Sequence, residues 1–382
     1  MSISPPEKRL SLNNMRKYRN QLIVGIIFTS AVAVIVALIS NVGELAEKLS
    51  DFPLWLLIPI IVMKLVNWTM SYMEWHYFLH VIHVYPVFRG TTQPAIPPDQ
   101  PATIRVSDSL ILWVASLPLA LSPGKVAEIL KAIILKSMNQ TPISRSSPII
   151  IAERLVDGIA VVTLVGISAL VASDHIFISD DVSANYIRGI LIGITIIMIL
   201  LISVIQFRKA AYWLINLLTT IPFFQRYTNE IRAIYDSSYH LAKIRHLLPT
   251  TFFGITAYFT DCIGFYIMLI GLGETPSVRL FAQATFILGF SVVISAVSAL
   301  PGGAGGREVT VGAFLTNVVG MSSAATGAAV LMIGVFQIWF GTLVGIIVGL
   351  IFRKRLFPPN LEAEIEAYEH QHNDKTMPQP SL

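Results

Sequence analysis

Two apolar stretches of this chain, residues 107–137 and 284–320, are interrupted in the same unusual way. Each holds a Pro-Gly pair near its middle, and each pair is followed within a few residues by a basic residue and a carboxylate. Helix-breaking residues and charges are costly inside a bilayer. Two such interruptions in corresponding positions of two halves are the best indication that a sequence can give of a transporter's binding site. We therefore expect a protein that moves a molecule across a membrane.

The composition is that of a membrane protein. Of the 382 residues, 54% are hydrophobic and 13% are charged, and the mean hydropathy is +0.67, whereas a soluble domain carries about 25% charged residues. The basic residues behind the net charge of +4 flank the apolar runs, where membrane topology explains them, so no nucleic-acid partner is predicted. The single cysteine, Cys262, excludes an intrachain disulfide framework and a cysteine-based metal site.

Several windows exceed the roughly 18 apolar residues that a helix needs to cross a bilayer. The apolar run after residues 1–20 is too long for the core of a signal peptide, so we expect a retained first helix. The predicted full spans are Gln21–Ser40, Pro53–Tyr77, Pro148–Ala172, Asn185–Ile205, Leu248–Gly271 and Thr326–Phe352.

The two interrupted elements lie at equivalent places between these spans. An arm of about 15 residues rises only about 22 Å, less than the hydrocarbon core of about 30 Å, so each element is expected to be a re-entrant helical hairpin. Pro123 and Pro301 are 178 positions apart, and so are Pro148 and Thr326, where the following spans begin. The predicted fold is an all-α polytopic membrane protein, an inverted repeat of two spans, a re-entrant hairpin and one span.

The charges of the loops predict the orientation. Basic residues gather in every second connection and acidic residues in the others, so both termini are expected on the cytoplasmic side of the cell (inner) membrane. Residues 85–106 are expected to form a cytoplasmic loop. The predicted organisation is a basic cytoplasmic N-terminus at 1–20, repeat 1 at 21–172 with its hairpin at 107–137, repeat 2 at 185–352 with a cytoplasmic amphipathic insertion at 207–247 and its hairpin at 279–320, and a cytoplasmic tail at 353–382.

The first interruption is followed by charges that suit an anion. A helix that starts after Pro123-Gly124 would aim its free N–H groups at the hairpin tip, where they attract negative charge. Lys125, Glu128 and Lys131 follow at spacings of three, within about one helical face, and make this a candidate phosphate site. The alternative is that the two lysines only extend toward the headgroups of the inner leaflet.

The second interruption combines glycine, arginine and glutamate. Pro301, Gly302 and Gly303 open the segment PGGAGG, whose glycines let the backbone approach a ligand or a helix closely. The helix that follows would again aim N–H groups inward. Arg307 can bind a phosphate or carboxylate through two N–H groups, and Glu308 is next to it. We expect both side chains to contact a substrate headgroup.

Further ionisable residues lie inside predicted spans, where they are costly unless they are paired or wetted. Glu153 and Asp157 share a helical face, and Arg154 is a candidate partner for a carboxylate of a neighbouring hairpin. The alternative is a structural ion network that locks the first hairpin to this helix. Asp261, well inside a span, indicates either a coupling site for a proton or cation, or the partner of a basic group.

No metal or other cofactor is predicted. His76, His80 and His83 would share one helical face, as zinc ligands can, but no carboxylate or cysteine completes the set, so interfacial packing is expected. The chain has no Walker motif for ATP, no HExxH motif and no evident nucleophile–base pair, so we do not expect an enzyme.

The motifs of both halves together resemble one known family. PGKVAEILKAIIL, then AERLVDGIAVV about 30 positions later, and PGGAGGREVTVGAF in the second half are similar in order and separation to the flippase-like family named after the transmembrane region of lysylphosphatidylglycerol synthase. The resemblance extends over most of residues 20–352. It implies lipid translocation, because its best-known members move aminoacylated phosphatidylglycerol between leaflets and others are associated with glycolipid or isoprenoid pathways. The positions that match the family's motifs are Lys125, Glu128, Glu153, Arg154, Asp157, Arg307 and Glu308.

Two departures from the family bear on the substrate. The chain ends at Leu382 without the aminoacyltransferase portion of two-part members, so a stand-alone member is expected that does not make the aminoacyl lipid itself. Gln337 stands where a basic residue is expected in many relatives. Both departures argue against carrying over the aminoacyl-lipid substrate.

The favoured function is a flippase that binds a phosphate-containing headgroup between the two hairpin tips and moves the lipid between leaflets. Its partner would be a phospholipid, a glycolipid or a polyprenyl-phosphate lipid. The alternatives are a secondary transporter of a small organic anion, a membrane enzyme acting on lipid phosphate, and a scaffold that transports nothing. A homo-oligomer is compatible with each of them.

Overall fold

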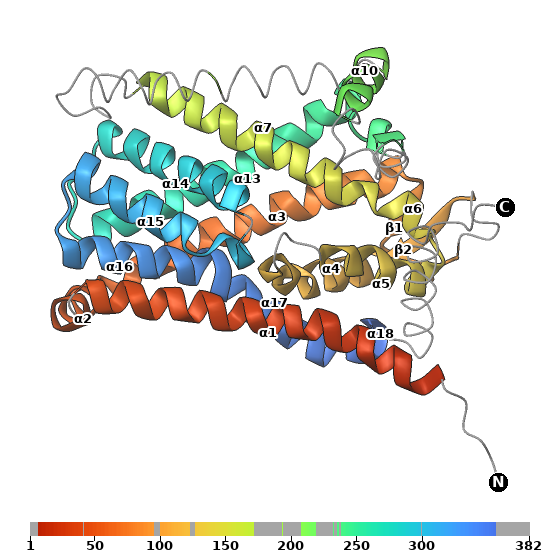
Figure 1. Ribbon diagram of the computed structural model, residues 1–382, viewed down its shortest axis with the longest axis horizontal. Helices are drawn as coiled ribbons and strands as arrows, with labels where there is room; N and C mark the ends of the chain where they lie inside the picture. Colours follow the sequence, from red (N-terminus) through yellow and green to blue (C-terminus); the bar gives the residue numbers. More distant parts are fainter. Residues whose placement is uncertain are drawn as a thin grey trace, which may run out of the picture.

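The computed structural model of the chain describes residues 7–40, 42–94, 100–122, 127–171, 193, 208–218, 232, 235–236, 238–298 and 300–356. These residues form a bundle of long helices that run along the longest axis of the molecule, with one small sheet at one end (Figure 1). Several of the helices are long and apolar enough to cross a membrane. The chain is therefore an all-α polytopic membrane protein, as its composition predicted.

The elements follow one another in the order that the apolar pattern predicted, with short helical pieces at each interruption. The first half contains α1 (Glu7–Ile39), α2 (Val42–Ser50), η1 (Leu54–Leu56), α3 (Leu57–Val81), β1 (Val84–Val87), β2 (Ala102–Arg105), α4 (Val106–Ala115), η2 (Leu117–Leu121), α5 (Ile129–Asn139), α6 (Ile143–Ser146) and α7 (Pro148–Val171). The second half contains α10 (Arg208–Leu218), α13 (Ile244–Gly271), α14 (Val278–Ser298), η4 (Pro301–Gly303), α15 (Gly306–Phe314), the π-helical η5 (Leu315–Val319), α16 (Ser323–Gly334), the π-helical η6 (Val335–Trp339), α17 (Phe340–Ile351) and α18 (Arg353–Leu356).

Four of the predicted full spans coincide with helices that are long and apolar enough to cross a bilayer. A fifth such helix is α14, the first arm of the second hairpin. It is 21 residues long, whereas an arm of about 15 was expected from the rise needed for a re-entrant element. The five candidate spans are Asn20–Ile39, Leu54–Val81, Ile244–Gly271, Val278–Ser298 and Ser323–Ile351.

The other two predicted spans have different outcomes. Pro148–Ala172 matches α7 to within one residue at its end, but α7 carries three charged residues in its first half and is not among the five candidates. Asn185–Ile205 lies outside the described residues except for Gly193.

Three segments outside the predicted spans have secondary structure. The expected loop 85–106 contains β2 and most of β1, which pair in parallel; alternate residues of β2, Ala102 and Ile104, are fully buried. The acidic connection after the first span folds as α2. The first helix begins at Glu7, so it includes most of the predicted N-terminal segment 1–20.

The cytoplasmic segments predicted in the second half are described in part. Within the insertion 207–247, α10 exposes Trp213, as an interfacial amphipathic helix would. The start of the predicted tail folds as α18, where Leu356 is fully buried and Arg355 NH1 lies 3.3 Å from Asp108 Oδ1. Residues 357–382 lie outside the described part of the chain.

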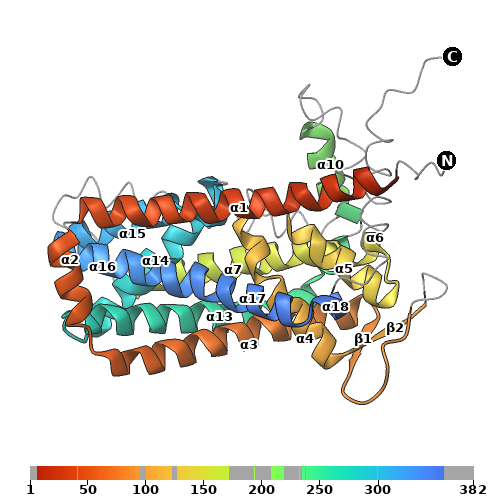
Figure 2. The same cartoon turned by 90° about the horizontal axis from the view of Figure 1, so that it is seen from below.

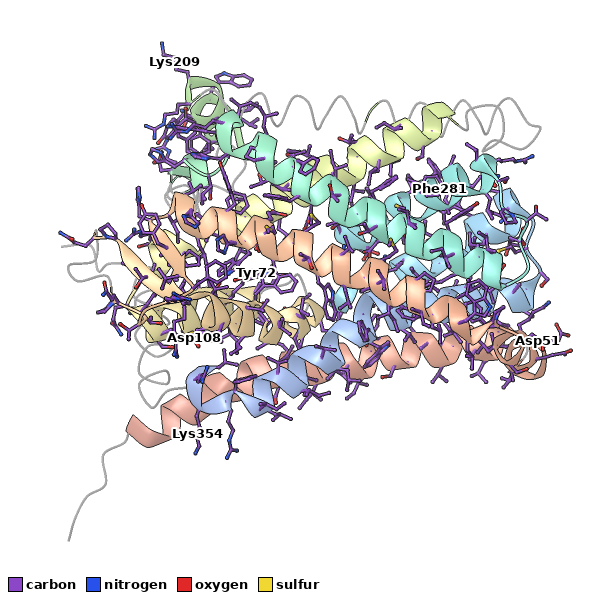
Figure 3. All side chains as sticks on the ribbon, turned by 180° about the vertical axis from the view of Figure 1, so that it is seen from behind. Asp51, Tyr72, Asp108, Lys209, Phe281 and Lys354 are labelled. Atoms are coloured by element: carbon purple, nitrogen blue, oxygen red, sulfur yellow. The ribbon has the colours of Figure 1, made fainter. Side chains whose placement is uncertain are left out.

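Both interrupted elements fold back on themselves. In the first, α4 and η2 lead to the interruption and α5 returns beside α4; in the second, α14 leads to the interruption and α15 returns along α14. The α4–α5 pair lies toward the end that carries the sheet and α18, whereas the α14–α15 pair lies toward the end that carries α2 (Figures 1 and 2). Figure 3 shows the same separation between Asp108 in α4 and Phe281 in α14. The two hairpins therefore extend inward from opposite ends of the bundle.

Each hairpin packs on the helix that follows the other hairpin. The first hairpin contacts α17, where a Cβ on Gly345 would crowd Pro118 and lie 2.8 Å from Val114 O. The second hairpin contacts α7, where Gly289 lies closely against Val165. Glycine at such crossings lets membrane helices approach closely. The helices that precede the hairpins, α3 and α13, also pack on each other. This reciprocal packing is what two structurally related halves would produce.

The buried apolar side chains form two clusters. One is centred on α13, α14 and α16 and includes Phe265 and Phe286, and the other is centred on α3, α4, α5 and α7 and includes Trp75 and Phe78. Each cluster supports one hairpin, and the ion pairs described below lie on the helices that build them.

Candidate functional site

The segment that leads to the first interruption lies next to the second interruption. The segment η2, the last one described before the first interruption, contacts η4, which is the second interruption, and both contact α1. A Cβ built on Gly302 would lie 3.0 Å from Leu121 Cδ2 and 3.5 Å from Thr29 Cγ2. Gly302 also has a φ of +61°, a conformation that glycine adopts without strain. The structure thus brings the end of η2, just before the first interruption, against the tip of the second hairpin.

The tip of the second hairpin is a glycine-rich turn held by two side chains. Gly302, Gly303 and Gly305 all have positive φ, at 61°, 68° and 85°. Ser295 Oγ of α14 donates to Gly303 O at 3.2 Å. Glu308 Oε2 accepts the N–H of Gly305 at 2.6 Å and so caps α15. One of the N–H groups that were expected to face a ligand therefore donates to Glu308 instead.

Arg307 is buried at this tip, with 6% of its surface exposed. Its NH1 donates to Gln337 Oε1 at 3.0 Å, and its NH2 donates to Gly302 O at 2.7 Å. Its Nε has no hydrogen-bond partner among the described residues. Gln337, the departure from the family pattern, lies in the π-helical segment η6; such segments are frequent at functional sites. The guanidinium thus has neutral hydrogen-bond partners, and its Nε is left for an anion.

At the first hairpin, Lys131 of α5 and Glu153 of α7 form a buried ion pair. Lys131 Nζ lies 2.8 Å from Glu153 Oε1, and the side chains are 8% and 12% exposed. The same Nζ lies 3.7 Å from the centroid of the Trp75 ring, a cation–π contact. Lys131 is thus held inside the protein and does not extend to headgroups. The predicted site residues that lie outside the described part of the chain are Pro123, Gly124 and Lys125.

Arg154 bridges α7 and the first hairpin. Its NH1 lies 2.9 Å from Asp157 Oδ2 on the same helix, and its Nε lies 3.7 Å from Glu128 Oε2 at the start of α5. The Arg154 side chain is 40% exposed. The carboxylate partner on a hairpin that the sequence predicted is therefore Glu128. Together with the Lys131–Glu153 pair, the Arg154–Glu128 pair also forms the ion network that was the alternative, because both of these pairs connect the first hairpin to α7.

Asp261 of α13 pairs with Lys64 of α3. Lys64 Nζ donates to both carboxylate oxygens at 3.2 Å, and the side chains are 10% and 11% exposed. Asp261 also lies within electrostatic range of Arg307.

Glu74 of α3 was missed by the analysis of motifs. Its surface is only 5% exposed, and its Oε1 has no hydrogen-bond partner among the described residues. The signal that could have found it is the presence of a carboxylate within a predicted span, Pro53–Tyr77. The charged groups with which it interacts electrostatically, on α5 and α7, are Lys131, Glu153, Arg154 and Asp157.

A cavity of about 510 Å³ lies beside the second tip, between α1, α2, α15, α16 and η6. Its walls are mostly apolar, with Leu49, Phe52, Val330 and Trp339 among them, and Glu308 contributes a carboxylate. The sequence did not reveal this cavity, because its walls come from helices far apart in the chain.

The histidines form ring contacts near the sheet. The rings of His76 and His80 are 5.1 Å apart, and His83 Nδ1 lies 3.1 Å from the hydroxyl of Tyr85. Among the described residues, no group of three or more His, Cys, Asp or Glu side chains could hold a metal ion.

Fold and site together define a class: a polytopic helical membrane protein with two helical hairpins whose tips meet beside buried charges. A family model described as the lysylphosphatidylglycerol synthase TM region matches residues 22–345 of this chain. The chain therefore belongs to that family, as its motifs predicted, and a membrane function related to lipids follows. Comparisons with curated proteins and with solved structures gave no match.

Proposed function

We propose that the protein is a lipid translocase in which two re-entrant hairpins of an inverted repeat enter the membrane from opposite sides and bind a headgroup where they meet. The family supports a lipid substrate. The opposed hairpins and their reciprocal packing support the inverted repeat (Figures 1 and 2). Broken helices that meet near the midplane are the usual place of a transporter's site.

The observation that carries the proposal is a buried cation next to an apolar cavity. Arg307 is 6% exposed, and its Nε has no partner among the described residues. The next residue, Glu308, lines the cavity of about 510 Å³. A buried guanidinium one residue away from a lining residue of a mostly apolar cavity suits an amphipathic molecule, a phosphate-bearing headgroup with an apolar chain.

The same cavity favours a lipid over a small organic anion. A water-soluble anion gains little from walls of leucine, phenylalanine and valine, whereas an acyl or prenyl chain can pass from the bilayer to such walls at little cost, because lipid tails and these side chains are similarly apolar. The substrate classes proposed are therefore phospholipids, glycolipids and polyprenyl-phosphate lipids.

The charged residues have separate roles in this proposal. Arg307, with Arg154 and Lys125, would hold the phosphate, and Glu128, Glu153 and Glu308 would balance these charges or bind a cationic group. The end of the molecule with Asp108, Lys209 and Lys354 would face the cytoplasm, since basic residues gather there, and the end with Asp51 would face outward (Figure 3). The protein would act without chemistry of its own and without ATP.

Reconstitution in liposomes with labelled lipids of different headgroups tests the proposal. Wild-type protein is expected to move one headgroup class, and Arg307→Gln is expected to abolish that movement while the protein remains folded. The matched control is Arg279→Gln, which removes an exposed arginine from the same hairpin and should leave transport unchanged. Equal movement of every lipid by wild type and Arg307→Gln would contradict a specific headgroup site.

A further inference from the structure

Outside the proposed headgroup site, Glu74 is a buried carboxylate without an assigned role. It lies in α3, seven residues before the helix ends at Val81, and its surface is 5% exposed. Its Oε1 has no hydrogen-bond partner among the described residues. A carboxylate oxygen without a partner in such a place costs free energy unless something binds to it.

The surroundings of Glu74 have too many carboxylates for the bases that face them. From α5 it faces Lys131, and from α7 it faces Glu153, Arg154 and Asp157. Glu128 belongs to the same group through Arg154. The four carboxylates therefore outnumber the two bases among the described residues. A buried group of this kind binds a positive charge.

The bases that are present have other partners. Lys131 is held between Glu153 and the Trp75 ring, and Arg154 is held by Asp157 and Glu128. In contrast, Asp261, the acid that the sequence singled out for coupling, has Lys64 as its own base. Both carboxylate oxygens of Asp261 accept hydrogen bonds from Lys64, whereas Oε1 of Glu74 has no hydrogen-bond partner among the described residues.

A proton fits this place better than a metal ion. No group of three or more His, Cys, Asp or Glu side chains within the described residues could hold a metal ion, so the carboxylates do not converge as metal ligands would. A proton needs only one oxygen. Asp157, which interacts with Glu74, is the most exposed of the four carboxylates, at 27%.

We propose that Glu74 binds and releases the proton that drives transport, with Asp157 as the group that passes it to and from the surface. This step rests on the proposed function, since it supplies the drive for lipid movement. An O–H bond forms at the Glu74 carboxylate when a hydronium ion gives up its proton on one side, and that bond breaks when the proton returns to water on the other side. Binding neutralises one excess negative charge next to the first hairpin.

Infrared difference spectra of the purified protein in lipid nanodiscs test proton binding without any lipid substrate. Between mildly acidic and mildly alkaline pH, wild-type protein is expected to lose a C=O band of a protonated carboxylic acid, and this band should be absent from Glu74→Gln. The control Glu47→Gln, which changes an exposed glutamate of α2, should keep the band. A band that persists in Glu74→Gln would overturn the proposal.

Two additions keep this test decisive. Should Glu74→Gln fail to fold, Glu74→Asp retains a carboxyl group, and the band must then move in frequency; an unmoved band overturns the assignment. Replacing Na⁺ by N-methylglucamine should leave the titration unchanged. A band change that follows Na⁺ and not pH would assign the place to a metal cation and overturn the proton.

Transport in liposomes tests the coupling. If one proton moves per lipid, each unit of pH difference shifts the distribution of lipid between leaflets by about tenfold. Glu74→Gln is expected to remove this dependence on the gradient. A wild type that moves lipid with no response to the gradient overturns the coupling, whereas a wild type that moves no lipid overturns the proposed function and leaves the proton site to be judged by the infrared result.

Discussion

The buried ion pair between Lys64 and Asp261 allows a quantitative prediction. The ammonium lies 3.2 Å from both carboxylate oxygens, and each side chain is about one-tenth exposed. At that distance and an effective dielectric constant of about 20, the attraction is about 5 kcal/mol. Removal of one partner from a buried pair leaves the other charge uncompensated and typically costs about 3–5 kcal/mol. We expect costs of this size for Lys64→Met and Asp261→Asn.

The two single substitutions are not expected to be equal. Asp261 lies within electrostatic range of Arg307, so Lys64→Met leaves the carboxylate with a second cation nearby. Asp261→Asn leaves two cations without their acid and should cost more. The double variant removes both charges, and its cost should fall well below the sum of the single ones, with a coupling energy of at least about 2 kcal/mol.

The free energy of unfolding in mixed detergent–SDS micelles, followed by circular dichroism, measures these costs. The control is Lys48→Met, which removes an exposed lysine of α2 and should change the free energy of unfolding by less than about 0.5 kcal/mol. Additive single costs, with a coupling energy near zero, would refute the reasoning, because they would mean that the two charges do not compensate each other.

Three further substitutions test the contacts between the hairpins and their neighbours. Gly302→Val should lower the free energy of unfolding by about 2 kcal/mol or more, because it forces a left-handed φ of +61° on a branched residue next to Leu121. Gly345→Leu should lower it by about 1–3 kcal/mol, because the side chain would separate α17 from α4. Arg307→Lys keeps the charge but cannot donate to both Gln337 and the carbonyl of Gly302 in the same geometry. The loss of one hydrogen bond to a charged group costs about 1.5–3 kcal/mol. We therefore expect lipid transport to fall by roughly 10- to 100-fold.

A matched glycine provides the control for the first two of these substitutions. A Cβ on Gly334 would meet no atom within 4 Å, so Gly334→Ala should change the free energy of unfolding by less than about 0.5 kcal/mol. Gly302→Val as stable as wild type would mean that the tips do not meet. For Arg307→Lys, unchanged transport would show that a positive charge alone suffices at this position.

Helix length and the presence of buried charges could be predicted from the sequence, since both depend on local composition. The limit is visible at α14. The arm was expected to have about 15 residues, yet α14 has 21, and Gln283 near its start is buried and donates to Val318 O at 3.4 Å. A polar side chain that finds a partner in the folded protein extends a helix that composition alone would shorten.

The partners of the buried charges could not be predicted, because they depend on which helices pack together. Lys64 and Asp261 are 197 positions apart, and nothing in the local pattern of either connects them before α3 packs on α13. Glu74 lies near the end of its predicted span, where water would have been an adequate partner. It is buried because charged groups of α5 and α7 surround it.

The opposed arrangement of the hairpins is tested most directly by labelling single cysteines in intact cells. Cys262 is the only cysteine in the sequence, so Cys262→Ala gives a background without cysteine. Gln93 and Thr275 are exposed and lie on the connections that lead into the first and the second hairpin. A membrane-impermeant thiol reagent is predicted to label Thr275→Cys and to reach Gln93→Cys only after the membrane is opened. Labelling of both positions from the same side would contradict hairpins that enter from opposite faces.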